Sequence, residues 1–425
     1  MTSADIASLG DRGQIEAWAR TVMRWSVALI VFVSMGVFSP ALVPEQQAQL
    51  QQVAALGLWM VVIATSFLIT PVLRLNLTAD VVALAAFYGF AILSACWSDL
   101  TAPTFMKAAA LAITTFAAYR LATRLDIDDI LGATTFALFL LIASSIFTAL
   151  FIPRIGVDDS WMHSGQWQGI FASKQALGIF AAHLLLFATY RKINGGGWIE
   201  FVIVAGAAAA AVVGAGSRGG GALAVAACVA LYLCARSTLP MKLMAIGPLL
   251  LSAFACVMIF YLYSTGYDSF HVGGTTVDFT ERSFIWQFAI SHFNDAPLFG
   301  YGLNGFWTIK QFYDYFEQSH GWVLDNFHSG YLAILIETGL VGFALFLTAT
   351  VLVVTRALLV IRHRTMFRQH CTLAIVFILL SYQINLTETN FLRSTSFLSI
   401  LLIVVQLTLC GAPAMIVRRH EGRQS

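Results

Sequence analysis

Four basic or titratable side chains could bind a phosphate or move a proton, and three of them stand near the edges of long apolar runs. Arg218 follows Ser217 in GAGSRGGGALA, and Lys174 lies in WQGIFASKQALG. Arg282 lies in ERSFIWQFAI and His328 in FHSGYLAILIETGLVG. A guanidinium binds phosphate oxygens in a bidentate manner, and an imidazole can accept a proton from a hydroxyl group. Together these residue types indicate phosphate binding combined with acid–base chemistry.

The composition indicates the environment in which these residues act. Of the 425 residues, 59% are hydrophobic and 11% are charged, whereas a soluble domain carries about 25% charged residues. The apolar runs approach the roughly 20 residues that a helix needs to cross a bilayer, and a helix satisfies its own backbone hydrogen bonds in lipid. The sequence therefore predicts an all-α polytopic membrane protein.

We expect twelve membrane helices and one large extracytoplasmic loop. The connection over 264–328 is rich in aromatic residues and contains a sequence typical of a short interfacial helix, so it is interpreted as a folded cap rather than a disordered linker. The predicted parts are residues 1–263 with helices 1–9, the cap over 264–328, and residues 329–425 with helices 10–12 and a cytoplasmic tail. The apolar runs lie near 22–39, 53–73, 80–97, 104–121, 129–152, 169–190, 198–214, 217–235, 241–263, 329–355, 369–388 and 392–411.

The distribution of Lys and Arg predicts the orientation of the chain. If both termini are cytoplasmic, seventeen of the 24 basic residues fall on the cytoplasmic side, in agreement with the positive-inside rule. The basic residues on the other side are not explained by topology and are candidates for function. They are Lys107, Arg154, Lys174, Arg218, Arg282, Lys310 and Arg393.

Each candidate also has a structural interpretation. Ser217 can cap the eighth helix, whose start with Arg218 suits an anion, but the neighbouring glycines could equally serve close helix packing. Lys174 could extend to the interface as an ordinary surface lysine, and Arg282 could contact lipid headgroups. His328 begins the tenth helix, where the dipole favours a neutral imidazole that could act as a general base, or the residue could be a cap.

Glu337 is a single carboxylate inside an apolar run. It follows His328 by nine residues, about 13 Å along a helix, which is too far for direct contact. Because carboxylates in membranes normally have a partner, a structural hydrogen-bonding role is expected.

Several common sites have no signature in this sequence. The six cysteines lie in apolar runs without metal-ligand spacing, and there is no nucleotide-binding loop, no acidic pair for a divalent ion and no basic block for nucleic acid. No metal or cofactor is therefore expected. The energy for a reaction must arrive with the substrate, as an activated lipid diphosphate would supply it.

The motifs GSRGG at 216–220, ERSFIWQFAI followed by Pro297 and GYGLNGFW, and FHSGYLAILIETGLVG resemble the O-antigen ligase and Wzy-type polymerase superfamily. WQGIFASKQALG and GYGLNGFW resemble its ExoQ-like exopolysaccharide branch. The resemblance implies a metal-independent, inverting glycosyltransferase at the outer face of the bacterial inner membrane, with an undecaprenyl-diphosphate-linked glycan as donor. It also implies that Arg218 and Arg282 hold the diphosphate and that His328 activates the acceptor hydroxyl.

The sequence departs from the family pattern at two places. Relatives often have Asn after the histidine, where this chain has Ser329, and often a His-Lys-Asn run where it has Ser173, Lys174 and Gln175. Lys174 is still grouped with the diphosphate-binding residues. The resemblance also suggests a flippase and a chain-length regulator as partners.

Three functions remain open at this stage. The first is polymerisation of lipid-linked repeat units into a surface or extracellular polysaccharide. The second is ligation of a finished glycan to another acceptor, such as lipid A core. The third is transport of lipid-linked sugars, to which Glu337 and His183 would contribute charge inside the membrane.

Overall fold

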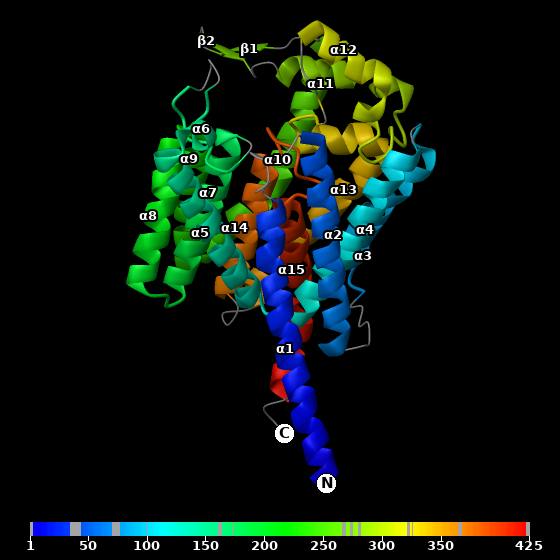
Figure 1. Cartoon of the computed structure of the whole chain (residues 1–425). Coiled ribbons are helices and arrows are strands. Elements are labelled where there is room, and N and C mark those ends of the chain that lie inside the picture. The colour runs from blue at the N-terminus through cyan, green and yellow to red at the C-terminus, as the bar shows by residue number, and fades with distance from the viewer. Residues whose placement is uncertain are drawn as a thin grey trace.

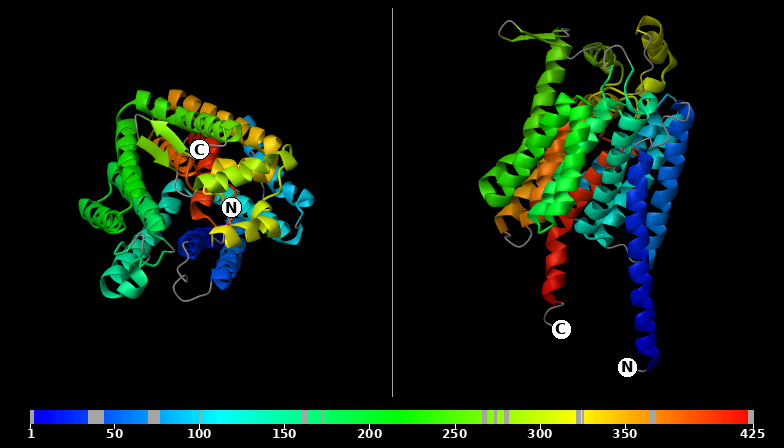
Figure 2. Two further views of the ribbon diagram at one scale, coloured as in Figure 1. Left: turned by 90° about the horizontal axis from the view of Figure 1, so that it is seen from above. Right: turned by 60° about the vertical axis from the view of Figure 1, so that its left-hand side comes forward.

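The computed structural model describes residues 3–34, 44–69, 77–99, 101–159, 164–171, 173–265, 269–272, 275–278, 282–320, 324, 326–363 and 368–421. Long helices form a bundle, and the segment between α10 (Thr238–Thr265) and α13 (Gly330–His363) covers one end of it (Figure 1). α1 (Ser3–Ser34) begins, and α15 (Phe397–Glu421) ends, beyond the opposite end (Figure 2). Both chain ends therefore lie away from the cap.

Each of the twelve apolar runs overlaps one long helix. Besides α1, α10, α13 and α15, these are α2 (Pro44–Ile69), α3 (Ala79–Leu93), α4 (Thr101–Arg124), α5 (Ile127–Phe151), α7 (Lys174–Ile193), α8 (Trp198–Gly214), α9 (Arg218–Arg236) and α14 (Arg368–Ile384).

Eight helices among the described residues are long and apolar enough to cross a membrane, and three further apolar stretches, Trp198–Gly214, His370–Ile384 and Phe397–Leu409, are shorter. The all-α polytopic membrane fold is thus confirmed. The number of twelve spans, the orientation and the division into three parts stay predictions.

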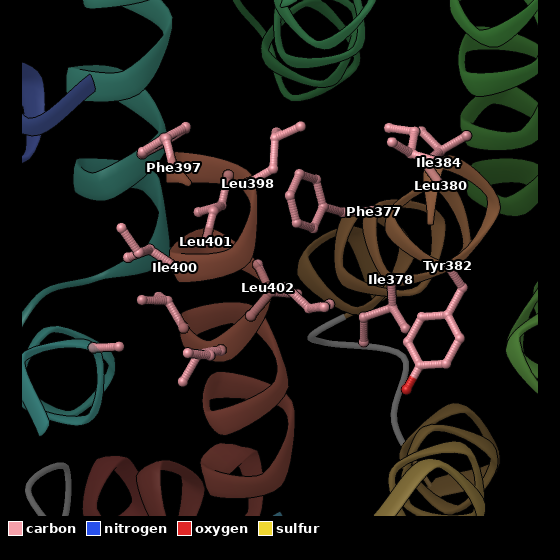
Figure 3. Close-up of a cluster of buried hydrophobic side chains, with 14 of the residues drawn as sticks. Phe377, Ile378, Leu380, Tyr382, Ile384, Phe397, Leu398, Ile400, Leu401 and Leu402 are labelled. Atoms are coloured by element: carbon pink, nitrogen blue, oxygen red, sulfur yellow. The ribbon is translucent and has the colours of Figure 1, made fainter. Parts of the chain in front are cut away.

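The centre of the bundle is formed by α14 and α15. Their sequences are apolar all round, a pattern typical of helices buried on every side. Phe377 and Leu380 of α14 pack in the same buried cluster as Leu398 and Leu401 of α15 (Figure 3). The loop that joins these helices, residues 385–396, is therefore attached at both ends to the buried core of the bundle.

The cap contains an aromatic core and several short elements. They are β1 (Ser269–Val272) and β2 (Thr275–Asp278), which pair antiparallel, α11 (Arg282–Ser291), α12 (Lys310–His320), and two 3-10 turns at Phe293–Asp295 and Phe306–Thr308. The short helices were expected, but the hairpin was not. Its two strands are the only named strands among the described residues. The remaining short elements are α6 (Pro153–Gly156) and a 3-10 turn at Ser94–Trp97.

The aromatic core of the cap fixes the segment that carries His328. Trp286 of α11 is buried and its indole N–H donates a hydrogen bond of 2.8 Å to the carbonyl of Phe327. Tyr301 donates a hydrogen bond of 2.7 Å to the carbonyl of His292. Burial, together with the nearby Asp295, raises the pKa of the Tyr301 phenol, so this donor stays protonated.

α13 is interrupted at Gly339, where the sequence predicted a continuous helix. Gly339 has φ 65° and ψ −168°, outside helical values. The cap segment 297–302 fills the break with its backbone: Tyr301 and Gly302 N–H groups donate to the carbonyls of Ile336 and Glu337 at 3.0 and 2.9 Å. On the other side of the break, Leu340 and Val341 N–H groups donate to the carbonyls of Pro297 and Leu298. The interruption leaves these backbone groups satisfied, as membrane proteins require.

Candidate active site

His328 lies two residues before the first residue of α13 and has a left-handed backbone conformation, with φ 49°. This region is uncommon for residues other than glycine, but histidine is enriched in it. The backbone N–H of His328 donates to Asn326 Oδ1 at 2.9 Å, which stabilises the turn. About a third of the side chain (33%) is exposed, so the imidazole is accessible from one side.

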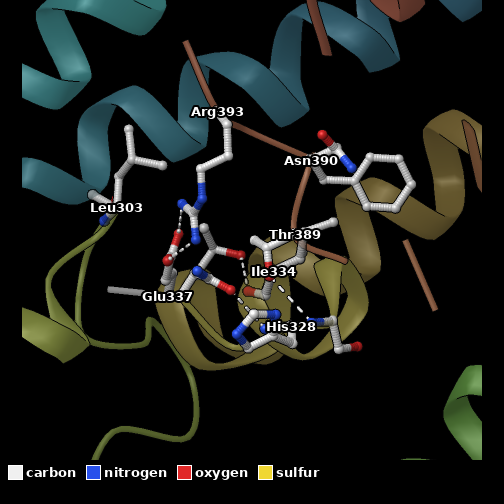
Figure 4. A network of polar contacts seen from close by, with 12 residues as sticks. Leu303, His328, Ile334, Glu337, Thr389, Asn390 and Arg393 are labelled. Atoms are coloured by element: carbon white, nitrogen blue, oxygen red, sulfur yellow. Dashed lines mark hydrogen bonds and ion pairs between the residues drawn. The ribbon is translucent and has the colours of Figure 1, made fainter. Parts of the chain in front are cut away.

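The start of α13 is held by the loop 385–396 (Figure 4). The N–H of Ser329 donates to Thr389 Oγ1 at 3.1 Å, and the N–H of Gly330 donates to the carbonyls of Asn385 and Glu388 at 2.8 and 3.0 Å. A Cβ atom at Gly330 would lie 2.0 Å from Asn385 Oδ1. Only glycine therefore permits this close approach beside His328.

Glu388 is the residue of the site that the sequence analysis missed. Its Oε1 accepts a hydrogen bond of 2.9 Å from Arg282 Nη2, and its Oε2 lies 3.6 Å from His328 Nδ1. This Nδ1 is buried and has no hydrogen-bond partner among the described residues. The three side chains come from α11, from His328 two residues before the start of α13, and from the loop 385–396. A carboxylate in this place can orient an imidazole and stabilise it once it has accepted a proton.

Arg282 therefore has a carboxylate partner, in addition to the diphosphate-binding role predicted for it. Its guanidinium carries five N–H donors, and the interaction with Glu388 uses one nitrogen. The remaining donors stay available for phosphate oxygens.

Arg218 is the first residue of α9, and its exposed side chain has no ion pair or hydrogen bond within the described part of the chain. Ser217 caps the helix and accepts from the Gly220 N–H at 3.1 Å. The glycines of this motif differ in environment: a Cβ at Gly220 would lie 2.7 Å from the Gly178 backbone of α7, whereas nothing lies within 4 Å of one at Gly219. Gly220 thus serves helix packing, and Gly219 leaves the space beside Arg218 open.

Lys174 is the first residue of α7, after the N-cap Ser173. Its Nζ donates to Gln166 Oε1, in a segment whose Trp167 N–H donates to the carbonyl of Gly214 at the end of α8. The starts of α7 and α9 are thus joined at the cap end of the bundle (Figure 1). Within the described residues, neither Lys174 nor Arg218 makes a hydrogen bond or ion pair with His328, Arg282 or Glu388.

Glu337 has a partner of the expected kind. Its two carboxylate oxygens accept bonds of 2.8 and 3.1 Å from Arg393, and its side chain is 1% exposed (Figure 4). It forms no hydrogen bond or ion pair with His328 among the described residues. Within that same part of the chain, no group of three or more His, Cys, Asp or Glu side chains could hold a metal ion.

Comparison with known proteins finds a family match in one part of the chain. Residues 201–347 match the family model described as O-antigen ligase. This segment, about a third of the chain, is similar to the O-antigen ligase family. The matched segment includes Arg218, Arg282, His328 and Glu337, whereas Glu388 and Arg393 lie beyond it. No curated protein matches the chain. This family match supports a glycan ligase or polymerase type of function in a membrane.

Proposed function

We propose that this protein polymerises undecaprenyl-diphosphate-linked oligosaccharide repeat units into a surface or extracellular polysaccharide. The reaction takes place at the periplasmic face of the bacterial inner membrane, on the side covered by the cap. The observation that carries the proposal is the contact of His328 and Arg282 with one carboxylate, Glu388, within a chain that in part matches the O-antigen ligase family.

In the proposed reaction, His328 accepts the proton of an acceptor hydroxyl. The hydroxyl oxygen attacks the anomeric carbon of the donor glycan, the bond from that carbon to the diphosphate oxygen breaks, and undecaprenyl diphosphate leaves with the bonding electrons. In-line attack inverts the configuration at the anomeric carbon. Glu388 stabilises the imidazolium and fixes the orientation of its ring.

The leaving diphosphate gains negative charge, so cations beside it lower the barrier. Arg218 is exposed at the capped start of α9, where the N–H groups of the first turn add to the positive potential. Arg282 supplies the second guanidinium, and Lys174 contributes a further positive charge at the start of α7. No metal ion is needed in this mechanism, because the arginines and helix start neutralise the diphosphate.

Ligation of a finished glycan to a separate acceptor such as lipid A core is the second candidate, and the description of the matching family favours it. The chemistry at His328 would be the same, and only the acceptor would differ. A transporter would need a broken helix and an intramembrane charge along an open pathway. Here the break at Gly339 is occupied by cap backbone and Glu337 is bound by Arg393, so both features are accounted for by packing.

The test uses purified full-length protein in liposomes with undecaprenyl-diphosphate-linked repeat units extracted from the native host. Products are separated on gels and weighed by mass spectrometry. A ladder of lipid-linked oligomers from this single substrate supports the polymerase. Transfer only after addition of a separate acceptor identifies a ligase, and movement of the substrate across the bilayer without transfer identifies a transporter.

A further inference from the structure

The loop 385–396 contacts both ends of the first part of α13. We call residues 330–338 the half-helix, since α13 is interrupted at Gly339. At its start, Gly330 is hydrogen-bonded by the carbonyls of Asn385 and Glu388. At its end, Glu337 is bound by Arg393 through two hydrogen bonds. The same loop is therefore hydrogen-bonded to the half-helix at two places, beside His328 and near the break at Gly339.

The contact between Arg393 and Glu337 fixes the relative orientation of the two groups as well as the distance between them. Two parallel N–H···O bonds between a guanidinium and a carboxylate fix the relative plane of the two groups. The Arg393 side chain is 13% exposed and that of Glu337 is 1% exposed, so water competes little for these bonds. A buried pair of this kind is favourable only when its geometry is good, which makes it sensitive to small displacements.

Hydrogen bonds inside the loop connect this contact to the site. Asn385 Oδ1 accepts bonds of 2.9 Å from the N–H groups of both Asn390 and Phe391. Asn390 Oδ1 in turn pairs with Ser396 Oγ at 2.9 Å. Glu388 lies within the turn that these bonds close, five positions before Arg393. A displacement of Arg393 is therefore expected to move the Glu388 carboxylate relative to His328.

We propose that Arg393 and Glu337 are positioning residues that hold Glu388 opposite His328, so that the imidazole is oriented for proton transfer. This inference rests on the proposed function, because it assigns the pair a role in the same reaction. Neither residue touches His328, Arg282 or Glu388 through a hydrogen bond or ion pair within the described part of the chain; their effect is transmitted through the loop and the half-helix.

The main test compares two substitutions on similar ion pairs. Arg393→Lys keeps the charge but replaces the bidentate contact with a single ammonium. The matched control is Arg356→Lys: Arg356, in the second part of α13, binds the buried Asp80 through two bonds of 2.9 and 3.2 Å. This pair joins α13 to α3.

If the proposal holds, Arg393→Lys lowers kcat about 10- to 100-fold with little change in the KM for the donor, since small misplacements of reacting groups cost this much. Arg356→Lys lowers thermal stability to a similar degree but keeps kcat. Equal effects of both variants on kcat would overturn the proposal, because the Arg393 pair would then act through general stability.

A second measurement does not depend on glycan transfer. Diethyl pyrocarbonate acylates accessible neutral imidazole, and mass spectrometry locates the modified histidine. We expect the modification rate of His328 to change severalfold in Arg393→Lys and to stay at the wild-type value in Arg356→Lys. An unchanged rate in Arg393→Lys would overturn the proposed positioning. If the wild-type protein performs no transfer but the modification rate of His328 still changes in Arg393→Lys, the positioning role stands and the proposed function is refuted.

If Arg393→Lys does not accumulate in the membrane, the double variant Glu337→Gln with Arg393→Gln replaces it. This variant leaves no unpaired charge in the interior, so it avoids the main cost of breaking a buried pair. The same two measurements apply, and a wild-type kcat in a correctly folded double variant would contradict the positioning role.

Discussion

Replacement of Gly339 by alanine tests whether the interruption of α13 is essential to the fold around the site. Gly339 has φ 65° and ψ −168°, a combination that essentially only glycine adopts. A Cβ at this position would lie 2.3 Å from the carbonyl oxygen of Leu298 and 2.6 Å from the nitrogen of Phe299. Both are backbone atoms of the cap segment that fills the break, so they cannot rotate away as a side chain would.

Two costs add for this substitution. A residue with a side chain in this backbone region costs about 1–3 kcal/mol. Overpacking against the cap backbone costs about a further 1–3 kcal/mol. The total of about 2–6 kcal/mol is a substantial fraction of the stability of a typical domain, about 5–15 kcal/mol. Relief of the strain requires the cap segment to withdraw, which would break the hydrogen bonds to Leu340 and Val341.

The assay is thermal unfolding in detergent at one fixed scan rate, followed by glycan transfer in liposomes. The control is Gly89→Ala in α3, where an added Cβ has no atom within 4 Å and helix propensity favours alanine. We expect Gly339→Ala to unfold several degrees lower and to lose transfer, while Gly89→Ala unfolds at or above the wild-type temperature. A wild-type unfolding temperature for Gly339→Ala would refute the assigned geometry of the break.

Three further substitutions test the candidate site. His328→Ala should lower transfer by at least about 100-fold, the usual contribution of a general base, while the protein inserts at normal levels; near-normal transfer would remove His328 as the base. Arg218→Lys should reduce kcat/KM for the donor about 10- to 100-fold, since a point charge replaces a bidentate donor, and full activity would assign Arg218 to the membrane interface. Glu388→Gln should lower kcat at least about tenfold because the carboxylate beside His328 is lost. Its unfolding temperature should change little, because the partly exposed pair with Arg282 is worth about 1 kcal/mol or less; a large drop in stability with unchanged kcat would make Glu388 structural.

The membrane fold could be predicted because its physical cause is local. A run of about 20 apolar residues must form a helix in lipid, whatever the rest of the chain does. The interruption at Gly339 was not predictable in the same way. Glycine is frequent inside membrane helices, and only the approach of the cap segment distinguishes this one from a continuous helix.

The candidate site was predictable only in part, for a related reason. His328 and Arg218 stand out because each is polar at the edge of an apolar run, and Arg282 because topology does not explain a basic residue there. Glu388 gave no such signal: the sequence analysis assigned it to the end of the run over 369–388, whereas α14 ends at Ile384. Its partners lie 60 and 106 positions away in the chain, so no local pattern could connect them.

Glu337 and Arg393 illustrate a second limit of prediction from the sequence. A carboxylate inside an apolar run predicted that a partner exists, and Arg393 was among the basic residues that topology did not explain. Pairing them required the path of the loop 385–396 over the half-helix, which depends on packing between distant helices. The sequence thus identified both members of the pair but not the contact.

The two arginines of the site enter the proposed reaction in different states. Arg218 has no partner in the described part of the chain, so a diphosphate there gains its full attraction without displacing another group. Arg282 is already bound to Glu388, which also faces His328. A phosphate oxygen that binds the other donors of Arg282 would draw part of its charge away from Glu388. The carboxylate could then approach His328 Nδ1, which has no hydrogen bond among the described residues. In the proposed reaction, Arg218 would provide donor affinity, while Arg282 would link the bound donor to the base.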